Sequence, residues 1–226
     1  RILKRVAAKE TSDYIRSLHI SKGVKIKEEI GLDRLKIVGD KALSASLTDG
    51  SDISVDFVIV GIGISPNTEL AKSAKLNINN GIFVNDECRT SISNIYAAGD
   101  CTSFEYKNTL VRLESVGNAI DQANTVAQNI LQQNTKYIPK PWFWSDQYNL
   151  KLQIAGLSTG YDDVVVRKGE NGQVSHWYFK GPNLLAVDAL NDPRCYMIGK
   201  RLIEANNSPT KNQLKDKDFN FKVLLK

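Results

Sequence analysis

Residues 90–101 read Thr-Ser-Ile-Ser-Asn-Ile-Tyr-Ala-Ala-Gly-Asp-Cys, and this stretch decides the predicted fold. Its apolar run over 94–100 predicts a buried strand that delivers Gly99 and Asp100 to the carboxyl edge of a sheet. Ligands bind at that edge in open α/β folds. Glycine lets the backbone approach a ligand closely, and a neighbouring carboxylate can accept hydrogen bonds from hydroxyl groups. The stretch therefore predicts a ligand-binding turn, although a plain strand followed by an Asp-containing turn has the same spacing.

A second glycine loop lies upstream. Residues 56–61 form a continuous apolar run, which predicts a strand covered on both faces. The run ends in Gly-Ile-Gly-Ile-Ser-Pro-Asn-Thr over 61–68, before a short predicted helix at 69–73. A lone Gly-x-Gly is weak evidence for a nucleotide site, whereas the full string is more specific. The interpretation of this loop as a tight turn that needs glycine could be true at the same time.

The remaining patterns predict a mixture of helices and strands in at least two domains. An amphipathic helix is expected over 115–132, and further helices over 10–23 and 195–205. Strands are expected over 23–27, 35–38, 42–47, 152–157, 163–167, 174–179 and 184–189. Asp49 and Gly50 mark a turn, and Pro139 and Pro141 separate a C-terminal domain.

Composition and charge exclude several classes of function. The net charge of +5 is too small for a nucleic-acid-binding protein and fits an acidic protein partner better. No apolar run approaches the roughly 20 residues that a membrane helix needs, so no membrane association is expected. The three cysteines are far apart, which argues against a redox disulfide or a metal site and favours the reducing cytoplasm. His19 and His176 lie in a helix and a strand pattern, and no catalytic side chain is predicted.

An aromatic string opens the C-terminal domain. Residues 141–148 read Pro-Trp-Phe-Trp-Ser-Asp-Gln-Tyr. Trp142 and Phe143 are expected to form a hydrophobic plug between domains. Large flat rings also suit the wall of a cofactor site, because they exclude water and stack at little entropic cost.

These motifs together resemble a known family. The string Ile-Tyr-Ala-Ala-Gly-Asp-Cys with an upstream Thr resembles the second FAD-binding motif of the pyridine nucleotide-disulfide oxidoreductase superfamily. The aromatic string and Glu-Ser-Val at 114–116 are similar to the NADH:ferredoxin and rubredoxin reductases that serve oxygenases and cytochrome P450 systems. The resemblance covers nearly the whole chain and is weakest after Asn206. It implies that the chain corresponds to the C-terminal part of such a reductase.

The resemblance implies a role for each candidate site residue. Gly99 and Asp100 would contact FAD, Val116 would lie near the flavin, and Trp144 would lie against the isoalloxazine ring. The remaining implied contacts are with NADH: Ile62 and Gly63 would pack against it, and Glu114 would lie near the nicotinamide.

The fold class implied by the resemblance is α/β and α+β. Residues 1–65 would be the C-terminal part of a Rossmann-like NAD domain, and residues 66–140 the C-terminal part of a Rossmann-like FAD domain. Residues 141–226 would form a small α+β reductase C-terminal domain. The Gly-x-Gly-x-x-Gly turns that hold the two pyrophosphates in this family do not occur in the sequence. We therefore expect the full-length protein to be an enzyme and this chain alone to be inactive.

The implied function is electron transfer from NADH through FAD to a [2Fe–2S] ferredoxin or a rubredoxin. Two alternatives stay open at this point. A related flavoprotein could use another acceptor, as a monodehydroascorbate reductase or an apoptosis-inducing-factor-like oxidase does. The chain could also be a truncated, non-catalytic module that docks a partner.

Overall fold

The computed structural model describes residues 1–4 and 6–225 and contains two compact units, Arg1–Ile64 and Ser65–Lys226. In the part of the chain that the structure describes, the first unit holds one helix and one small sheet, and the second holds two further sheets with the remaining helices. The mixed α/β fold predicted from the sequence is confirmed. Among the described residues, no helix is both long and apolar enough to cross a membrane.

The first unit consists of α1 (Lys9–Ser21) and an antiparallel sheet in the order β1-β2-β3. The strands are β1 (Leu32–Val38), β2 (Lys41–Leu47) and β3 (Asp52–Ser54). The predicted helix is confirmed, and its stop at Gly23 fits the positive φ of +85° there. The predicted turn at Asp49 is also confirmed, because its carboxylate accepts hydrogen bonds from the backbone and side chain of Ser51. These hydrogen bonds lower the pKa of Asp49 to about 2.

Two strands predicted in the first unit are wrong. Residues 23–27 form a loop, and residues 56–61 form no strand. Phe57 and Ile59 are 73% and 84% exposed, so the apolar run is not covered on both faces. The backbone hydrogen bonds of a strand have to come from a neighbouring strand. An apolar run indicates that the segment tends to be buried, but it does not show that a partner strand is present.

The second unit begins with α2 (Glu69–Ser73), as predicted, and a small sheet in the order β4-β5-β6. The strands are β4 (Ile82–Phe83), β5 (Thr102–Tyr106) and β6 (Thr109–Val111). The strand predicted over 94–100 is wrong: only Tyr96 forms an isolated bridge, with Arg89. The regular strand starts at Thr102, immediately after the Gly-Asp-Cys turn. The turn therefore precedes a strand instead of following one.

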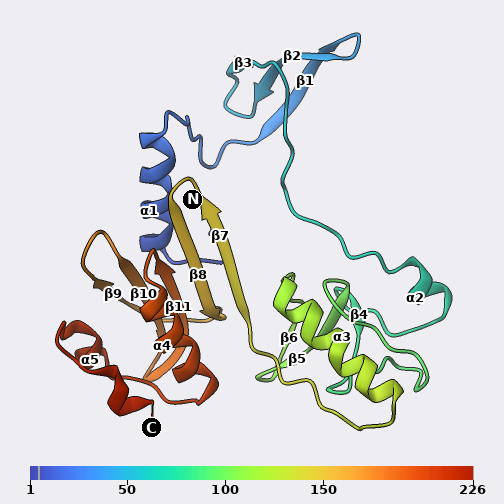
Figure 1. Cartoon of the computed structure of the whole chain (residues 1–226). Coiled ribbons are helices and arrows are strands. Elements are labelled where there is room, and N and C mark those ends of the chain that lie inside the picture. The colour runs from blue at the N-terminus through green and yellow to red at the C-terminus, as the bar shows by residue number, and fades with distance from the viewer. Residues whose placement is uncertain (5, 226) are drawn as a thin grey trace. The chain divides into compact units, whose positions relative to one another are not determined.

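Helix α3 (Val116–Ile130) confirms the predicted amphipathic helix (Figure 1), and the face that it buries is polar. Its buried residues, which we call the polar face of α3, are Asn118, Gln122, Thr125 and Asn129. Val116, Ile120 and Ile130 are exposed. The polar face is buried because its amides supply hydrogen bonds to loops that have few backbone partners of their own.

A five-stranded antiparallel sheet in the order β7-β8-β11-β10-β9 forms the C-terminal part. Its strands are β7 (Trp142–Gln147), β8 (Leu150–Gly156), β9 (Asp163–Lys168), β10 (Val174–Lys180) and β11 (Asn183–Leu190). The four strands predicted in this part are confirmed as β8 to β11. Strand β7 was not predicted as a strand, because its aromatic string was interpreted as a plug and a cofactor wall.

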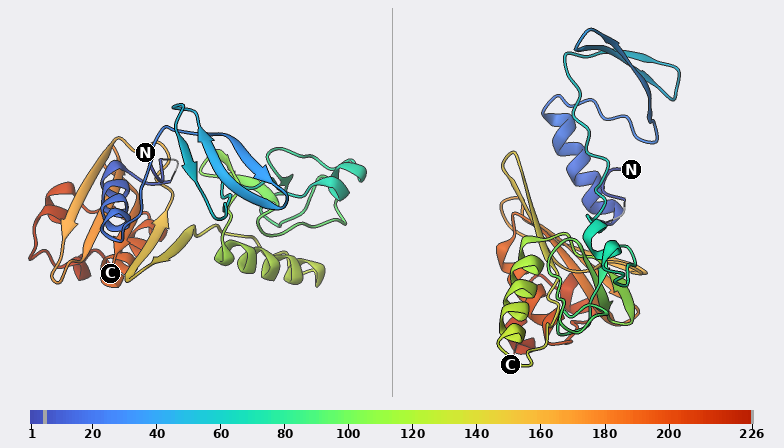
Figure 2. Two further views of the ribbon diagram at one scale, coloured as in Figure 1. Left: turned by 90° about the horizontal axis from the view of Figure 1, so that it is seen from above. Right: turned by 90° about the vertical axis from the view of Figure 1, so that its right-hand side faces the viewer.

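The C-terminal sheet is covered on one face by α4 (Pro193–Glu204), α5 (Lys211–Lys215) and the 3-10 helix η1 (Phe221–Leu224) (Figure 2). Helix α4 confirms the helix predicted from residue 195 and starts at Pro193, where Asp192 caps it. The core between sheet and helices includes Trp177, Val187, Leu202 and Phe221. Glycine at position 199 of α4 lets the helix approach the sheet, since a Cβ there would lie 2.6 Å from Val187.

Candidate functional site

The predicted ligand-binding turn is a closed β-turn over 99–102. The backbone N–H of Thr102 donates to the carbonyl of Gly99 at 2.9 Å. Gly99 has a φ of +86°, a conformation that glycine adopts without steric cost. Asp100 occupies the second position of the turn and is exposed. The turn therefore presents a carboxylate to solvent from a fixed backbone.

Two side chains, Gln122 and Arg112, form hydrogen bonds with this turn. The Oε1 atom of Gln122 accepts a hydrogen bond from the backbone N–H of Gly99 at 2.7 Å and one from the Thr102 hydroxyl at 2.9 Å. Arg112 donates from Nη1 to the carbonyl of Asp100 at 3.2 Å. The same guanidinium pairs with Glu114 at 2.6 Å, and its side chain is only 11% exposed. Arg112 thus connects Asp100 to Glu114.

The first turn of α3 lies beside this turn, because a Cβ built on Gly99 would contact Ala119 at 3.5 Å. The hydroxyl of Ser115 caps the helix by accepting from the backbone N–H of Asn118 at 3.2 Å. The N-terminus of a helix carries free N–H groups and a partial positive charge, which together favour anionic groups. Val116, at the first helical position, is exposed.

A stacked pair of indoles packs against the start of α3. Trp142 and Trp144 lie with their ring centroids 5.1 Å apart and their planes at 24°. A Cβ on Gly117 would lie 2.3 Å from Nε1 of Trp142, so glycine at this position makes room for the ring. Trp142 is half-buried, whereas Trp144 is 47% exposed. One flat ring is therefore presented at the surface with a second ring supporting it.

The structure brings together one part of the predicted site. Five predicted residues gather around the first turn of α3: Gly99, Asp100, Glu114, Val116 and Trp144. Ile62 and Gly63 belong to the first unit, where Ile62 is 91% exposed and Gly63 has a φ of +111°. The positive φ explains why glycine occupies position 63, and the packing of both residues against NADH stays a prediction.

The sequence patterns did not indicate the residues that support the site, chiefly Arg112, Gly117 and Gln122. The spacing of Asn118, Gln122, Thr125 and Asn129 on one helical face was a usable signal. It was not used because apolar residues are normally expected on the buried face.

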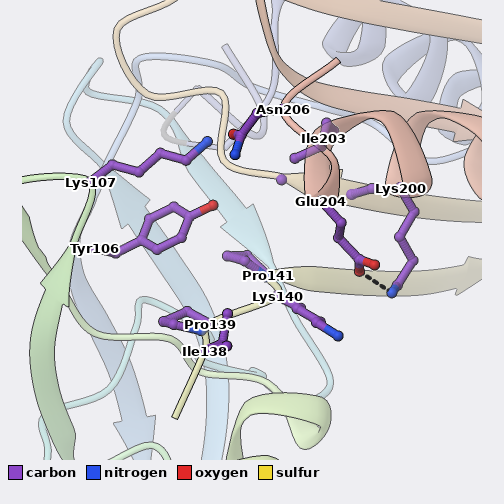
Figure 3. Close-up of a pocket in the computed structure, with 12 residues that line it drawn as sticks. Tyr106, Lys107, Ile138, Pro139, Lys140, Pro141, Lys200, Ile203, Glu204 and Asn206 are labelled. Atoms are coloured by element: carbon purple, nitrogen blue, oxygen red, sulfur yellow. Dashed lines mark hydrogen bonds and ion pairs between the residues drawn. The ribbon is translucent and has the colours of Figure 1, made fainter. Parts of the chain in front are cut away.

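A separate cavity of about 180 Å³ lies where the chain enters β7 (Figure 3). Tyr106, Ile138, Pro141 and Ile203 contribute to its apolar lining. Lys200 and Glu204 form an ion pair beside it. The cavity contains none of the predicted site residues. Among the described residues, no group of three or more His, Cys, Asp or Glu side chains could hold a metal ion.

Two known protein families match this chain. The pyridine nucleotide-disulphide oxidoreductase family matches residues 1–123, and a reductase C-terminal family matches residues 142–225. The first match covers more than half of the chain. The chain belongs to the pyridine nucleotide-disulphide oxidoreductase family.

Similar proteins agree with this family. Rhodocoxin reductase of Rhodococcus erythropolis is 38% identical over 228 residues, which cover 100% of this chain and 53% of the relative. A ferredoxin reductase from Rhodopseudomonas palustris superposes with a TM-score of 0.96 at 34% identity, covering 100% of this chain and 57% of that one. The reductase in a covalent putidaredoxin reductase–putidaredoxin complex gives a TM-score of 0.93 at 36% identity, with 100% and 55% covered. The chain spans about half the length of the relatives it matches.

The three cysteines differ in accessibility. Cys88 and Cys195 are buried, and burial raises the pKa of Cys88 to about 11 and that of Cys195 to about 12. Cys101 is half-buried and follows Asp100 directly. The thiolate is the reactive form of cysteine, so both burial and a raised pKa suppress reaction.

We therefore expect a thiol reagent at pH 8 to modify one cysteine of the native chain, Cys101, and all three after denaturation. Ellman's reagent with mass spectrometry measures both numbers. Cys101→Ser should leave the native chain unlabelled. Rapid native labelling of Cys88 or Cys195 would contradict the burial of these thiols.

Proposed function

We propose that the chain serves a flavoprotein oxidoreductase in which NADH is the electron donor and FAD the resident cofactor. The acceptor is a [2Fe–2S] ferredoxin or a rubredoxin. One observation carries the proposal: a fixed acidic turn, a helix N-terminus and a surface indole meet around the first turn of α3. The relatives named above support it, since they are a rhodocoxin reductase, a ferredoxin reductase and a putidaredoxin reductase in complex with putidaredoxin.

The residues around α3 fit a flavin dinucleotide. A cofactor of this kind has hydroxyl groups for a carboxylate and a flat ring for an aromatic wall. Asp100 would bind hydroxyl groups, and Trp144 and the first turn of α3 with Val116 would lie near the ring. Because Gly117 has no side chain, the ring of Trp142 fits against the start of α3 and the indole pair stays there. When bound, FAD supplies the exchange between a two-electron donor and one-electron acceptors.

The side chains themselves bind, orient and exclude water. Asp100 would accept hydrogen bonds from hydroxyl groups of FAD, and Val116 and Trp144 would cover its ring. Glu114, which Arg112 holds, would lie near the nicotinamide of NADH. Ile62 and Gly63 of the first unit would pack against NADH. The net charge of +5 favours the approach of an acidic acceptor protein.

The three-domain division into residues 1–65, 66–140 and 141–226 is part of this proposal. Residues 1–65 would belong to an NAD domain, residues 66–140 to an FAD domain and residues 141–226 to the reductase C-terminal domain. The cytoplasm is the proposed compartment, because the free thiols of Cys88, Cys101 and Cys195 suit a reducing environment.

The test is a titration of the purified chain with FAD, followed by visible absorption and flavin fluorescence. We expect Asp100→Asn to weaken FAD binding about tenfold or more, because a hydrogen bond to a charged acceptor contributes on the order of 1.5–3 kcal/mol. Bound FAD should also protect Cys101, the neighbour of Asp100, from thiol reagents.

Asp40→Asn is the matched control, because Asp40 is an exposed carboxylate in the turn between β1 and β2. It should bind FAD like the unaltered chain. Two results would overturn the assignment of the cofactor to this site. One is that Asp100→Asn binds FAD as tightly as the unaltered chain does, and the other is that the unaltered chain takes up no FAD at all.

A further inference from the structure

Gln122 lies fully buried in the polar face of α3, at a position where an apolar side chain would ordinarily pack. Its Oε1 atom accepts hydrogen bonds from both ends of the turn 99–102, at Gly99 and at Thr102. Asn118 lies 3.5 Å from the same oxygen through its Nδ2 atom. The carbonyl oxygen of one side chain therefore anchors the whole turn.

The other end of the same amide shows that this arrangement has a cost. The Nε2 atom of Gln122 is buried and has no hydrogen-bond partner among the residues that the structure describes. A buried donor without a partner loses its hydration and gains nothing in return. Leucine at this position would avoid that loss. The oxygen end of Gln122 thus has a function that compensates for the unpaired nitrogen.

The function of the Gln122 oxygen is to fix the turn that carries the Asp100 carboxylate. Gly99 is held at a positive φ. Gln122 bonds Gly99 and Thr102, which flank Asp100 and Cys101, and Arg112 donates to the backbone carbonyl of Asp100. Without the Gln122 oxygen, the N–H of Gly99 would lose its acceptor in a buried environment. The turn would then rearrange to find another, and the carboxylate of Asp100 would move with it.

We propose that Gln122 is a positioning residue that presets the Asp100 carboxylate for the hydroxyl groups of a dinucleotide. The proposal rests on the proposed function, because it takes FAD as the ligand of Asp100. Gln122 itself touches no ligand. It acts through the backbone of Gly99 and the hydroxyl of Thr102.

The test compares Gln122→Leu with a matched control on the same helix. Asn129 is also buried in the polar face, and its amide holds the carbonyls of Glu87 and Thr135 instead of the turn. Gln122→Leu should speed hydrogen exchange at the Gly99 amide by at least about tenfold, the equivalent of one lost hydrogen bond. Asn129→Leu should leave that amide unchanged. These rates are measured by NMR on the full chain without FAD.

The second readout is the affinity for FAD, from flavin fluorescence. Gln122→Leu should weaken binding about tenfold in the unaltered chain and less than about twofold in an Asp100→Ala background, because the effect passes through Asp100. Asn129→Leu should weaken binding by less than about twofold in either background. Gln122→Glu keeps an acceptor oxygen, so hydrogen exchange at the Gly99 amide should stay slow. This variant keeps the proposal testable if Gln122→Leu does not fold.

The outcomes separate the two hypotheses. Unchanged exchange at Gly99 in Gln122→Leu would overturn the anchoring of the turn even where FAD binds. Equal weakening of FAD binding with and without Asp100 would overturn the positioning role. No uptake of FAD by the unaltered chain would overturn the proposed function and the role of Gln122 in cofactor binding, whatever the exchange rates are.

Discussion

Replacing Gly156 by alanine is expected to lower the free energy of unfolding by more than about 3 kcal/mol. Gly156 ends β8 with a φ of +78°, and a Cβ there would lie 2.1 Å from the carbonyl oxygen of Leu185. That oxygen belongs to the backbone of β11, so the overlap cannot be relieved by rotating a side chain. Urea unfolding followed by far-UV circular dichroism measures the loss.

Gly160→Ala is the control for the positive φ alone. Gly160 has a φ of +80° and no atom within 4 Å of the position that a Cβ would take. Alanine there should cost about 1 kcal/mol, because an L-residue is strained in the left-handed conformation. Equal losses for the two variants would show that β8 and β11 approach less closely than the structure has them.

The effect at Gly156 should extend to the candidate site. The backbone N–H of Gly156 donates to the carbonyl of Pro141 at 2.9 Å, directly before β7 begins with Trp142. A shift of Gly156 would loosen the entry of β7 and with it the stacked indoles. We expect the near-UV circular dichroism of the tryptophans to weaken in Gly156→Ala at urea concentrations where the chain is still folded.

Trp177→Ala is expected to destabilise the chain by about 3–5 kcal/mol. Trp177 is fully buried in the core of the C-terminal sheet, and its ring stacks on Phe221 with the centroids 5.7 Å apart. Its Nε1 atom donates to the hydroxyl of Ser175 at 3.0 Å, so the polar end of the indole is satisfied too. The substitution leaves a large cavity and removes this hydrogen bond. The expected loss is a large share of the total free energy of unfolding, which is about 5–15 kcal/mol for a typical domain.

Trp144→Ala is the matched control, since it removes the same side chain from the surface. Trp144 is 47% exposed and stacks on Trp142. Loss of one aromatic pair costs about 0.5–1.5 kcal/mol. Both free energies come from the same urea unfolding measurements. A smaller loss at Trp177 than at Trp144 would contradict the burial of Trp177 in the core between the C-terminal sheet and its helices.

The sequence predicted the helices better than the strands. The sequence signals for α1, α2, α3 and α4, which are turn residues and apolar periodicity, lie within a few residues of each other, so local pattern is sufficient. The runs at 56–61 and 94–100 have the composition of buried strands but form none. Strand formation depends on a partner elsewhere in the chain, and composition carries no information about that partner.

The candidate site was predicted in its exposed part and missed in its supporting part. Asp100, Val116 and Trp144 were proposed because the family motifs include them. Gln122 and Arg112 were missed because their hydrogen bonds join segments that lie 10 or more residues apart in sequence. Only the folded chain shows that both reach the same turn.

The polar face of α3 also restricts the rotation of this helix about its own axis. Apolar side chains fit many rotations of a helix about its axis, whereas an amide is satisfied only by a particular partner in a particular direction. Asn118 pairs with Tyr137, and Asn129 pairs with the backbone of Thr135, so both ends of α3 have one correct rotation. A redesign that followed the hydrophobic pattern alone would turn α3 around and bury Val116, Ile120 and Ile130. Uniqueness of the fold in this region thus depends on directional bonds rather than on the amount of apolar surface removed from water.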